Sequence, residues 1–285
     1  MLIQSIPCSL NKLVVYIGTL TGSSDAGMAD VGKAEQHNVT ILDARKADPG
    51  SFHDTGFTLI TLDKEPVTTD WKSSFYDSET PDIKHFNEQM EPYIKQLYPS
   101  VKKIFWTFNV IRGGDKLGDQ PRAVGGPHLD YFQDDEARVE FHKEFPEMDV
   151  DRSEAKLMME KLDDEDHKLG VILGVWKPLS PAEVCDYPLA IMDARSFQPE
   201  NLSQNKLHIQ FMPGFTFHNL NGAISYDEDQ KWYYYSHQTQ MEVLIFHQYS
   251  KGKWFANPHT SFLNKNCPKD SEERISVELR VGLFF

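Results

Sequence analysis

Two histidines and one aspartate in this chain have the types and spacing of metal ligands. His128 and Asp130 are two residues apart, so in a strand their side chains share one face and can bind one ion. A third ligand, His259, comes from the distant run Asn257-Pro258-His259-Thr260. Two histidines and one carboxylate leave about three positions open on an octahedral ion, as non-haem Fe(II) requires to bind a cosubstrate and O2 together. The spacing of this triad therefore indicates oxygen chemistry.

The His-x-Asp spacing is common, and its surroundings give it weight. A chain with 11 histidines and 43 acidic residues can contain such a tripeptide by chance. Here Val124-Gly125-Gly126-Pro127 precedes it, and small residues let a ligand or a neighbouring backbone approach closely. A metal-binding strand is therefore expected at this point.

A polar face on the last segment of the chain adds a second candidate feature. Residues 274–281 alternate between polar and apolar types, which is typical of a strand with two unlike faces. Arg274, Ser276, Glu278 and Arg280 share the polar face. One interpretation is a solvent-exposed strand with an Arg-Glu pair. The other is a site in which a guanidinium binds a dicarboxylate cosubstrate through two hydrogen bonds and the serine adds another.

Strand-like segments recur from residue 101 onward, separated by clusters of Gly, Pro and Asn. A composition with 18 Phe, 11 Tyr, 16 Pro and 17 Gly favours short strands and turns. Without regular helices between them, the strands indicate an antiparallel sandwich or barrel. The predicted strands are Ile104–Ile111, Arg122–Tyr131, Val171–Trp176, Pro188–Met192, Leu207–Met212, Trp232–Tyr235, Val243–Tyr249 and Ile275–Phe285.

Residues 1–285 are expected to form a single domain with two regions set apart from its β core. Residues 1–100 have a mixed pattern, with a strand-like Leu13–Ile17 and a helical run at Ile83–Tyr98, and are interpreted as an N-terminal elaboration of the core formed by 101–285. The charge-rich segment 133–168 has a helical pattern. It is either a solvated surface insertion or a lid, because it directly follows the metal-binding strand.

The composition argues against several kinds of partner and location. Acidic residues outnumber basic ones by 43 to 29, and the net charge of −14 repels nucleic-acid phosphates and anionic membranes. The three cysteines, Cys8, Cys185 and Cys267, are widely spaced, which indicates a reducing compartment rather than a disulfide framework. No segment has the roughly 20 apolar residues of a membrane span, and residues 1–20 lack the pattern of a signal peptide. A cytoplasmic location is expected.

The motifs together resemble a known family. The order His-x-Asp, distal His, then Arg-x-Ser is similar to that of the iron(II)/2-oxoglutarate-dependent oxygenases, whose fold is a double-stranded β-helix. More narrowly, the sequence resembles the fungal AsaB-like hydroxylase/desaturase group, which is related to cephamycin methoxylases. The resemblance covers about residues 101–285 and implies a mainly β fold with flanking helices around a jelly-roll, cupin-like core. It rests on Val175–Leu179, Pro188–Ala190, Trp232–Tyr235, Glu242–Phe246 and Asn257–Phe262.

The resemblance implies a role for each matching residue. The triad would bind Fe(II), while Arg274 and Ser276 would bind the distal carboxylate of 2-oxoglutarate. Arg280 would either hold the other end of this cosubstrate or pair only with Glu278. Apart from the resemblance, Asn109 and Arg112, on the strand-like segment that leads into Gly113-Gly114, are second-rank candidates for contacting substrate or cosubstrate, and surface or turn roles are the alternative.

Two positions depart from the pattern of that family. Lys177 stands where arginine is expected in Trp-Arg-Pro, and His247 where lysine is expected in Phe-Lys-x-Tyr. Both departures bear on substrate preference rather than on the metal.

The sequence thus predicts an oxidoreductase that uses Fe(II), 2-oxoglutarate and O2 to hydroxylate, desaturate or cyclise a small organic metabolite, in specialised metabolite biosynthesis. One alternative is a metal-dependent jelly-roll dioxygenase or isomerase that needs no 2-oxoglutarate. Another is a non-catalytic β-sandwich that binds a small molecule. Neither the substrate nor the oligomeric state can be read from these patterns.

Overall fold

The computed structural model describes residues 11–17, 35–64, 81–113, 126–134, 136–137, 167–212 and 215–285. Most of its regular structure is strand, and the prediction of a mainly β fold with flanking helices is confirmed. The helices are α1 (Phe52–Thr55), α2 (Pro81–Leu97) and the short 3-10 helices η4 (Ala194–Ser196) and η5 (Pro199–Asn201). The strands are β1 (Asn11–Ile17), β2 (Glu35–Asp43), β3 (Phe57–Thr61), β4 (Lys103–Arg112), β5 (His128–Leu129), β6 (Leu169–Pro178), β7 (Leu189–Met192), β8 (Leu202–Met212), β9 (Phe215–Ile224), β10 (Trp232–Tyr234), β11 (Glu242–Ser250), β12 (His259–Ser261) and β13 (Ser276–Phe284).

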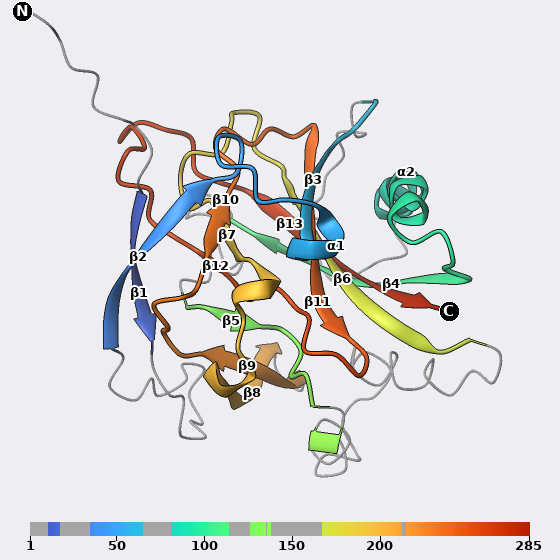
Figure 1. The fold of residues 1–285 in the computed structure, drawn as a ribbon. Helices are drawn as coiled ribbons and strands as arrows, with labels where there is room; N and C mark the ends of the chain where they lie inside the picture. Colours follow the sequence, from blue (N-terminus) through green and yellow to red (C-terminus); the bar gives the residue numbers. More distant parts are fainter. Residues whose placement is uncertain are drawn as a thin grey trace, which may run out of the picture.

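The strands form two sheets, and the chain passes from one sheet to the other several times (Figure 1). The larger sheet has the order β1-β2-β10-β7-β12-β5-β9-β8, and the smaller has the order β3-β11-β6-β13-β4. Among the described pairs only β10 with β2 is parallel. From β4 onward the chain alternates between the sheets, apart from the run β7 to β10, and this is how a jelly roll closes two sheets over one core. The predicted antiparallel arrangement is therefore present.

Helix α2 covers the outer face of the smaller sheet. Along β13, Val277, Leu279 and Val281 are fully buried in one apolar cluster with side chains of α2. Each such side chain contributes about 1.5–3 kcal/mol when it leaves water. The helix residues in this cluster are Ile83, Phe86, Met90 and Ile94. Because side chains alternate along a strand, the polar residues of β13 must face the opposite way, into the space between the sheets.

The first hundred residues contribute strands to both sheets. β2 pairs with β10 in the larger sheet, and β3 pairs with β11 in the smaller one. Neither strand was predicted from the sequence. The helical run expected at Ile83–Tyr98 corresponds to α2. Most of the segment 133–168 lies outside the described residues, so its interpretation as a lid stays a prediction.

One predicted strand is shorter in the structure, and another strand was not predicted. The strand expected at Arg122–Tyr131 is limited to the two residues of β5 within the described range, because the backbone turns away at Asp130. β9 was not predicted, since polar residues such as Thr216, His218 and Asn221 interrupt its apolar pattern. None of the described helices has the length and apolar character needed to cross a membrane.

Close packing of β6 against β11 generates a testable prediction about stability. A Cβ atom on Gly174 would lie 2.5 Å from Cζ of Phe246, and the Phe246 ring packs on His259 with centroids 4.9 Å apart. Gly174→Ala is therefore expected to lower the free energy of unfolding by about 1–3 kcal/mol through overpacking. Urea denaturation measures this change. Gly126→Ala is the matched control, because a Cβ there meets no atom within 4 Å; equal midpoints for the two variants would contradict the prediction.

Candidate metal centre

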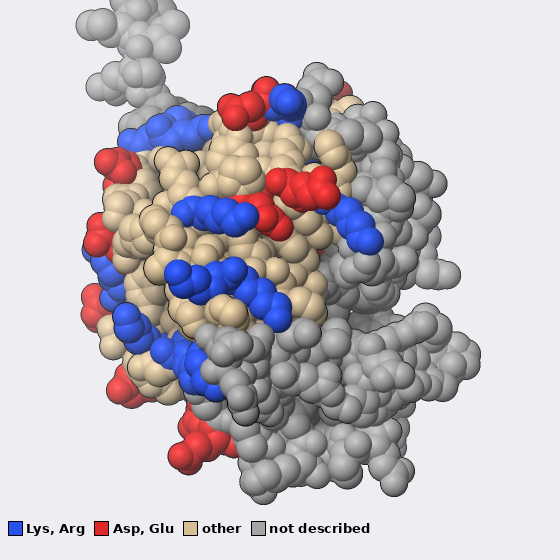
Figure 2. Space-filling model, turned by 90° about the vertical axis from the view of Figure 1, so that its right-hand side faces the viewer, with Lys and Arg blue, Asp and Glu red and all other residues tan. Residues whose placement is uncertain are grey.

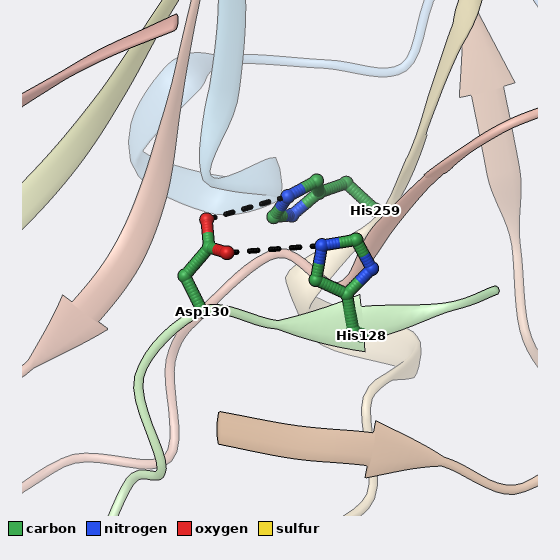
Figure 3. A group of neighbouring side chains, drawn as sticks. All are labelled: His128, Asp130 and His259. Carbon is green, nitrogen blue, oxygen red and sulfur yellow. Dashed lines mark ion pairs between the residues drawn. The ribbon is translucent and has the colours of Figure 1, made fainter. Parts of the chain in front are cut away.

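The pairing of two short strands brings the histidines of the triad together. β5 and β12 are antiparallel neighbours, and His128 is the direct partner of His259 across them. Directly opposed residues in a sheet point to the same face with their Cβ atoms close together. Asp130 follows β5 by one residue and returns its carboxylate toward both rings (Figure 3). The three predicted ligands thus meet in one place.

The distances within the triad suit a single ion. The Nε2 atom of His128 lies 3.7 Å from Oδ1 of Asp130, and Nε2 of His259 lies 3.5 Å from Oδ2. The two imidazole rings have centroids 4.5 Å apart. One ligand atom from each residue falls within 4.8 Å of the others, and this is the one such group of three potential ligands in the described part of the chain.

Backbone carbonyls determine which nitrogen of each histidine is available to the ion. Nδ1 of His128 lies 2.7 Å from the carbonyl oxygen of Gly126, and Nδ1 of His259 lies 3.3 Å from that of Asn257. A carbonyl only accepts, so each Nδ1 must carry the proton and donate it. Both Nε2 atoms are therefore left with a lone pair directed at Asp130. Metal-ligating histidines are commonly oriented in this way.

Burial keeps both histidines neutral. It lowers the pKa of His128 to about 4, with a smaller contribution from the neighbouring His259, and it also lowers the pKa of His259. For Asp130, burial alone would raise the pKa, but the guanidinium of Arg280, together with the nearby His259 and His128, outweighs burial and holds the pKa well below its usual range. Two neutral imidazoles and an ionised carboxylate are the protonation states that bind a divalent ion.

Both oxygens of the aspartate are held by residues from the smaller sheet. Nη2 of Arg280 is 3.0 Å from Oδ1 of Asp130, and Nε2 of Gln248 donates to Oδ2 at 2.6 Å. The same amide nitrogen donates to Glu278 at 3.0 Å. Burial, and next the charge of Asp130, raise the pKa of Glu278 to about 7. Arg280, expected from the sequence to be a cosubstrate ligand or a partner of Glu278, thus contacts the carboxylate of the candidate ligand Asp130 and also lies 3.6 Å from Glu278.

An irregularity in β11 places Gln248 at the triad. In the pairing of β11 with β6, His247 opposes Leu173 and Tyr249 opposes Ile172, so Gln248 is an extra residue at a bulge. Bulges redirect single side chains and are common beside active sites. Gln248 was not predicted from the sequence, because a glutamine in an apolar strand carries no signal of the partner it will meet. Its only signal in the sequence is that it is a polar residue within a largely apolar strand, and the structure shows that its side chain is completely buried.

Asn257 fixes the segment that carries His259. Its fully buried side-chain amide donates to the carbonyl oxygens of Thr55 and Met192, each at 2.8 Å, and its Oδ1 accepts from the backbone of His247 at 2.9 Å. Gly56 makes room for it, since a Cβ there would lie 2.4 Å from that oxygen. The amide therefore ties α1, β7 and β11 to the loop before β12.

The predicted cosubstrate residues lie beside the triad. Arg274 lines one cavity with both histidines and Arg112, and it stacks over Trp176 with its guanidinium carbon 5.6 Å from the ring centroid. Its Nη1 donates to the carbonyl oxygen of Tyr187 at 2.5 Å. Burial lowers the pKa of Arg274 to about 10, so it stays charged at neutral pH. The side chain of Asn109, the other second-rank candidate, lies outside what the structure describes.

Ser276, the first residue of β13, is buried and follows Arg274 by two residues. Its hydroxyl has no hydrogen-bond partner among the described residues. A buried hydroxyl without a partner loses the hydrogen bonds it makes in water, which costs about 1–3 kcal/mol. A ligand that accepts a hydrogen bond from the Ser276 hydroxyl, or donates one to it, would remove that cost.

Comparison with known proteins gives a family match and several relatives. Residues 14–284 match the family model described as "Oxidoreductase/YMDC permease-like domain". Aspirochlorine biosynthesis protein N of Aspergillus oryzae is 31% identical over 117 residues, which are 40% of this chain and 48% of that protein. The Fe(II)/2-oxoglutarate-dependent dioxygenase nvfI of Aspergillus novofumigatus is 33% identical over 114 residues, 39% of each chain. This chain thus aligns with less than half the length of both curated relatives.

A solved structure matches over almost the whole chain. The iron and alpha-ketoglutarate-dependent endoperoxidase NvfI superimposes with a TM-score of 0.70 at 20% identity, covering 97% of this chain and 98% of that one. The likeness confirms the predicted jelly-roll fold. Together with the two curated relatives it also confirms the predicted resemblance to fungal oxygenases.

Removing the amide that holds Asp130 tests its positioning role. Gln248→Leu keeps the size of the side chain and loses both hydrogen bonds, so the affinity for Co(II) is expected to fall about 10-fold to 100-fold. Titration of the visible d–d absorption measures it. Gln238→Leu is the control, because Gln238 is also buried but donates to the backbone of Glu242. Equal Co(II) affinities in the two variants would contradict the role.

The neutral histidines predict an unusual pH dependence of ion binding. Two ordinary histidines, with pKa near 6.5, would cost up to about 100-fold in affinity for each pH unit below that value. Because the pKa of His128 is about 4 and that of His259 is also lowered, the folded protein takes up these protons only at lower pH. Co(II) affinity should therefore change less than about 10-fold between about pH 6.5 and about pH 5. A 100-fold loss over that interval would show that the rings titrate normally.

Proposed function

Because the chain belongs to the Oxidoreductase/YMDC permease-like domain family and carries the triad in a jelly-roll core, we propose that it is a non-haem Fe(II)/2-oxoglutarate-dependent oxygenase. The observation that carries this proposal is the convergence of two neutral imidazoles and one ionised carboxylate beside a buried arginine. A curated relative named as an Fe(II)/2-oxoglutarate-dependent dioxygenase supports it.

The donor set suits Fe(II). His128, Asp130 and His259 would hold the ion through two nitrogens and one oxygen, a mixed set that leaves coordination positions for other ligands. The described residues around the triad offer no thiolate, which a structural zinc site usually contains. Arg280 and Gln248 keep the carboxylate ionised and oriented, so the site is prepared before the ion arrives.

Arg274 is the best-placed residue to bind 2-oxoglutarate. Arg280 is already engaged with Asp130 and Glu278, whereas the described partner of Arg274 is a neutral carbonyl. A carboxylate forms a stronger, charge-assisted pair with a guanidinium than a carbonyl does. The buried hydroxyl of Ser276, two residues after Arg274, would supply a further hydrogen bond. The side chains lining the narrow cavity must move apart to admit the cosubstrate.

Fe(II), 2-oxoglutarate and O2 together supply an oxidant that can remove hydrogen from carbon, with succinate and CO2 as coproducts. The chain contributes position and exclusion of water. Phe246 and Trp176 are fully buried beside the triad and the arginine, so the cavity wall on that side is dry. A dry wall strengthens every charge interaction inside the cavity.

The substrate we propose is a small organic metabolite of specialised metabolism, which the enzyme hydroxylates, desaturates or closes into a ring. A relative named for aspirochlorine biosynthesis supports this class. The net charge of −14 argues against a polyanionic substrate such as nucleic acid.

Reconstitution without oxygen tests the function. Adding Fe(II) and then 2-oxoglutarate to the protein is expected to produce a weak visible charge-transfer band, and admitting O2 is expected to yield succinate. Arg274→Ala should raise the Kd for 2-oxoglutarate at least about 30-fold, equivalent to about 2 kcal/mol, because a buried charge pair loses one partner.

Two measurements make this experiment decisive. Affinity for Co(II) should be unchanged in Arg274→Ala, since Arg274 contacts none of the triad, and Arg45→Ala serves as a control because Arg45 pairs with Glu242. If ion binding persists but no band or succinate appears, the chain is a metal-dependent jelly-roll enzyme that does not use 2-oxoglutarate. If no ion binds, it is a non-catalytic binding protein.

A further inference from the structure

A second cavity lies on the opposite side of the smaller sheet from the triad. Its volume is about 350 Å³, in the size range of small-molecule sites. The ring of Phe285, at the end of the chain, packs on Tyr98 and lies over Gly170, so the cavity lies beside the C-terminus. Figure 2 shows this side of the molecule, where basic side chains lie across the middle of the described surface. The lining residues are His53, Tyr98, Gly170, Val171, His247, Ser250, Lys251, Lys253 and Phe255.

Alternation along β11 separates this cavity from the metal centre. Phe246 and Gln248 face the triad, through contacts with His259 and Asp130. His247, between them, faces the other way and contacts Phe52 of α1 and Tyr98. The two sites therefore share a strand but no side chain.

A buried chain of hydrogen bonds forms the base of the cavity. The Tyr98 hydroxyl lies 2.6 Å from Nε2 of His247, and Nδ1 of the same ring lies 3.0 Å from Oγ of Ser250. Burial lowers the pKa of His247 to about 3 and raises the pKa of Tyr98, so both are neutral. The Tyr98 hydroxyl, the neutral His247 ring and the Ser250 hydroxyl then carry one polar hydrogen each, but the chain contains only two hydrogen bonds. In either tautomer one hydroxyl hydrogen remains at an end of the chain, available to an acceptor.

Two lysines give the cavity a positive rim. Lys251 and Lys253 lie in a turn fixed by hydrogen bonds from Lys251 N to the carbonyl of Gly170 and from Lys253 N to that of Ser250. Gly252 between them has φ of +67°, which suits glycine and sharpens the turn. Neither ammonium group has an ion-pair partner among the described residues, and no carboxylate side chain lines the cavity. In a chain of net charge −14, this is a local site for a negative group.

The remaining wall is aromatic. The ring of Phe255 packs edge-on against His247 with centroids 4.8 Å apart, and Tyr98 meets His53 edge-on at 6.1 Å. Aromatic walls favour a flat, apolar ligand body. The cavity thus combines an apolar slot, a spare hydroxyl donor and two free cations.

We propose that this cavity is a second ligand site, which binds a small aromatic carboxylic acid. Lys251 and Lys253 pair with the carboxylate, the hydroxyl at the end of the Tyr98-His247-Ser250 chain donates to it, and the ring lies against Phe255 and Tyr98. The site is independent of the proposed oxygenase activity, because none of its residues contacts the triad.

Calorimetric titration of the full chain with phenylacetate tests the proposal. Phenylacetate is expected to bind with Kd at or below about 1 mM, while the neutral isostere phenylacetamide gives no measurable heat. The double variant Lys251→Ala/Lys253→Ala should raise the Kd at least tenfold. Lys265→Ala/Lys269→Ala is the matched control, because both lysines are exposed and do not line the cavity, and it should bind as the unmodified chain does.

Three outcomes would overturn the proposal. One is that phenylacetate fails to bind the unmodified chain. Another is that binding is lost in Arg274→Ala but kept in the Lys251/Lys253 variant, which would place the acid at the metal centre. The third is that inorganic phosphate binds as tightly as phenylacetate, which would leave no role for the aromatic wall.

Discussion

The antiparallel pairing of β5 with β12 is the contact on which the candidate metal centre depends, because it sets His128 directly opposite His259. The two strands are only two and three residues long, so their own hydrogen bonds are few. They are held in register by β9 on one side and β7 on the other. Asn257 adds bonds to α1 and β7 just before β12. The neighbouring strands thus hold the two short strands that carry the candidate ligands in place.

The second constraint is electrostatic. Asp130, Glu278, Arg280 and Arg274 are all buried between the sheets, where an unpaired charge is costly. Arg280 compensates Asp130 directly, and the pKa of Glu278 rises to about 7, which reduces the negative charge that must be accommodated. Such a cluster contributes little to stability. What it supplies is a fixed, ionised carboxylate with two neutral imidazoles facing it.

The strands of the smaller sheet separate two environments. Apolar residues of β11 and β13 pack against α2 on the outer face, while Gln248, Arg274, Glu278 and Arg280 face inward. His247 and Lys177 are the two departures from the family pattern. His247 lines the second cavity. Lys177 follows Val175 by two residues along β6, so it lies on the same outward-facing side of that strand. Neither lines the cavity beside the triad. Their bearing on substrate preference stays a prediction.

Features that repeat locally could be predicted from the amino-acid sequence. Period-two alternation in residues 274–281 gave the polar face of β13, His-x-Asp with a distal histidine gave the candidate ligands, and runs of β-branched and aromatic residues gave most strands after residue 101. Which of these residues lie in contact depends on the tertiary structure. Gln248 reaches Asp130 through a bulge, Arg280 rather than Arg274 contacts that carboxylate, and β2 and β3 join sheets built from residues far along the chain. These contacts depend on strand order and register, which are set by packing between segments distant in sequence and leave no local periodicity to read.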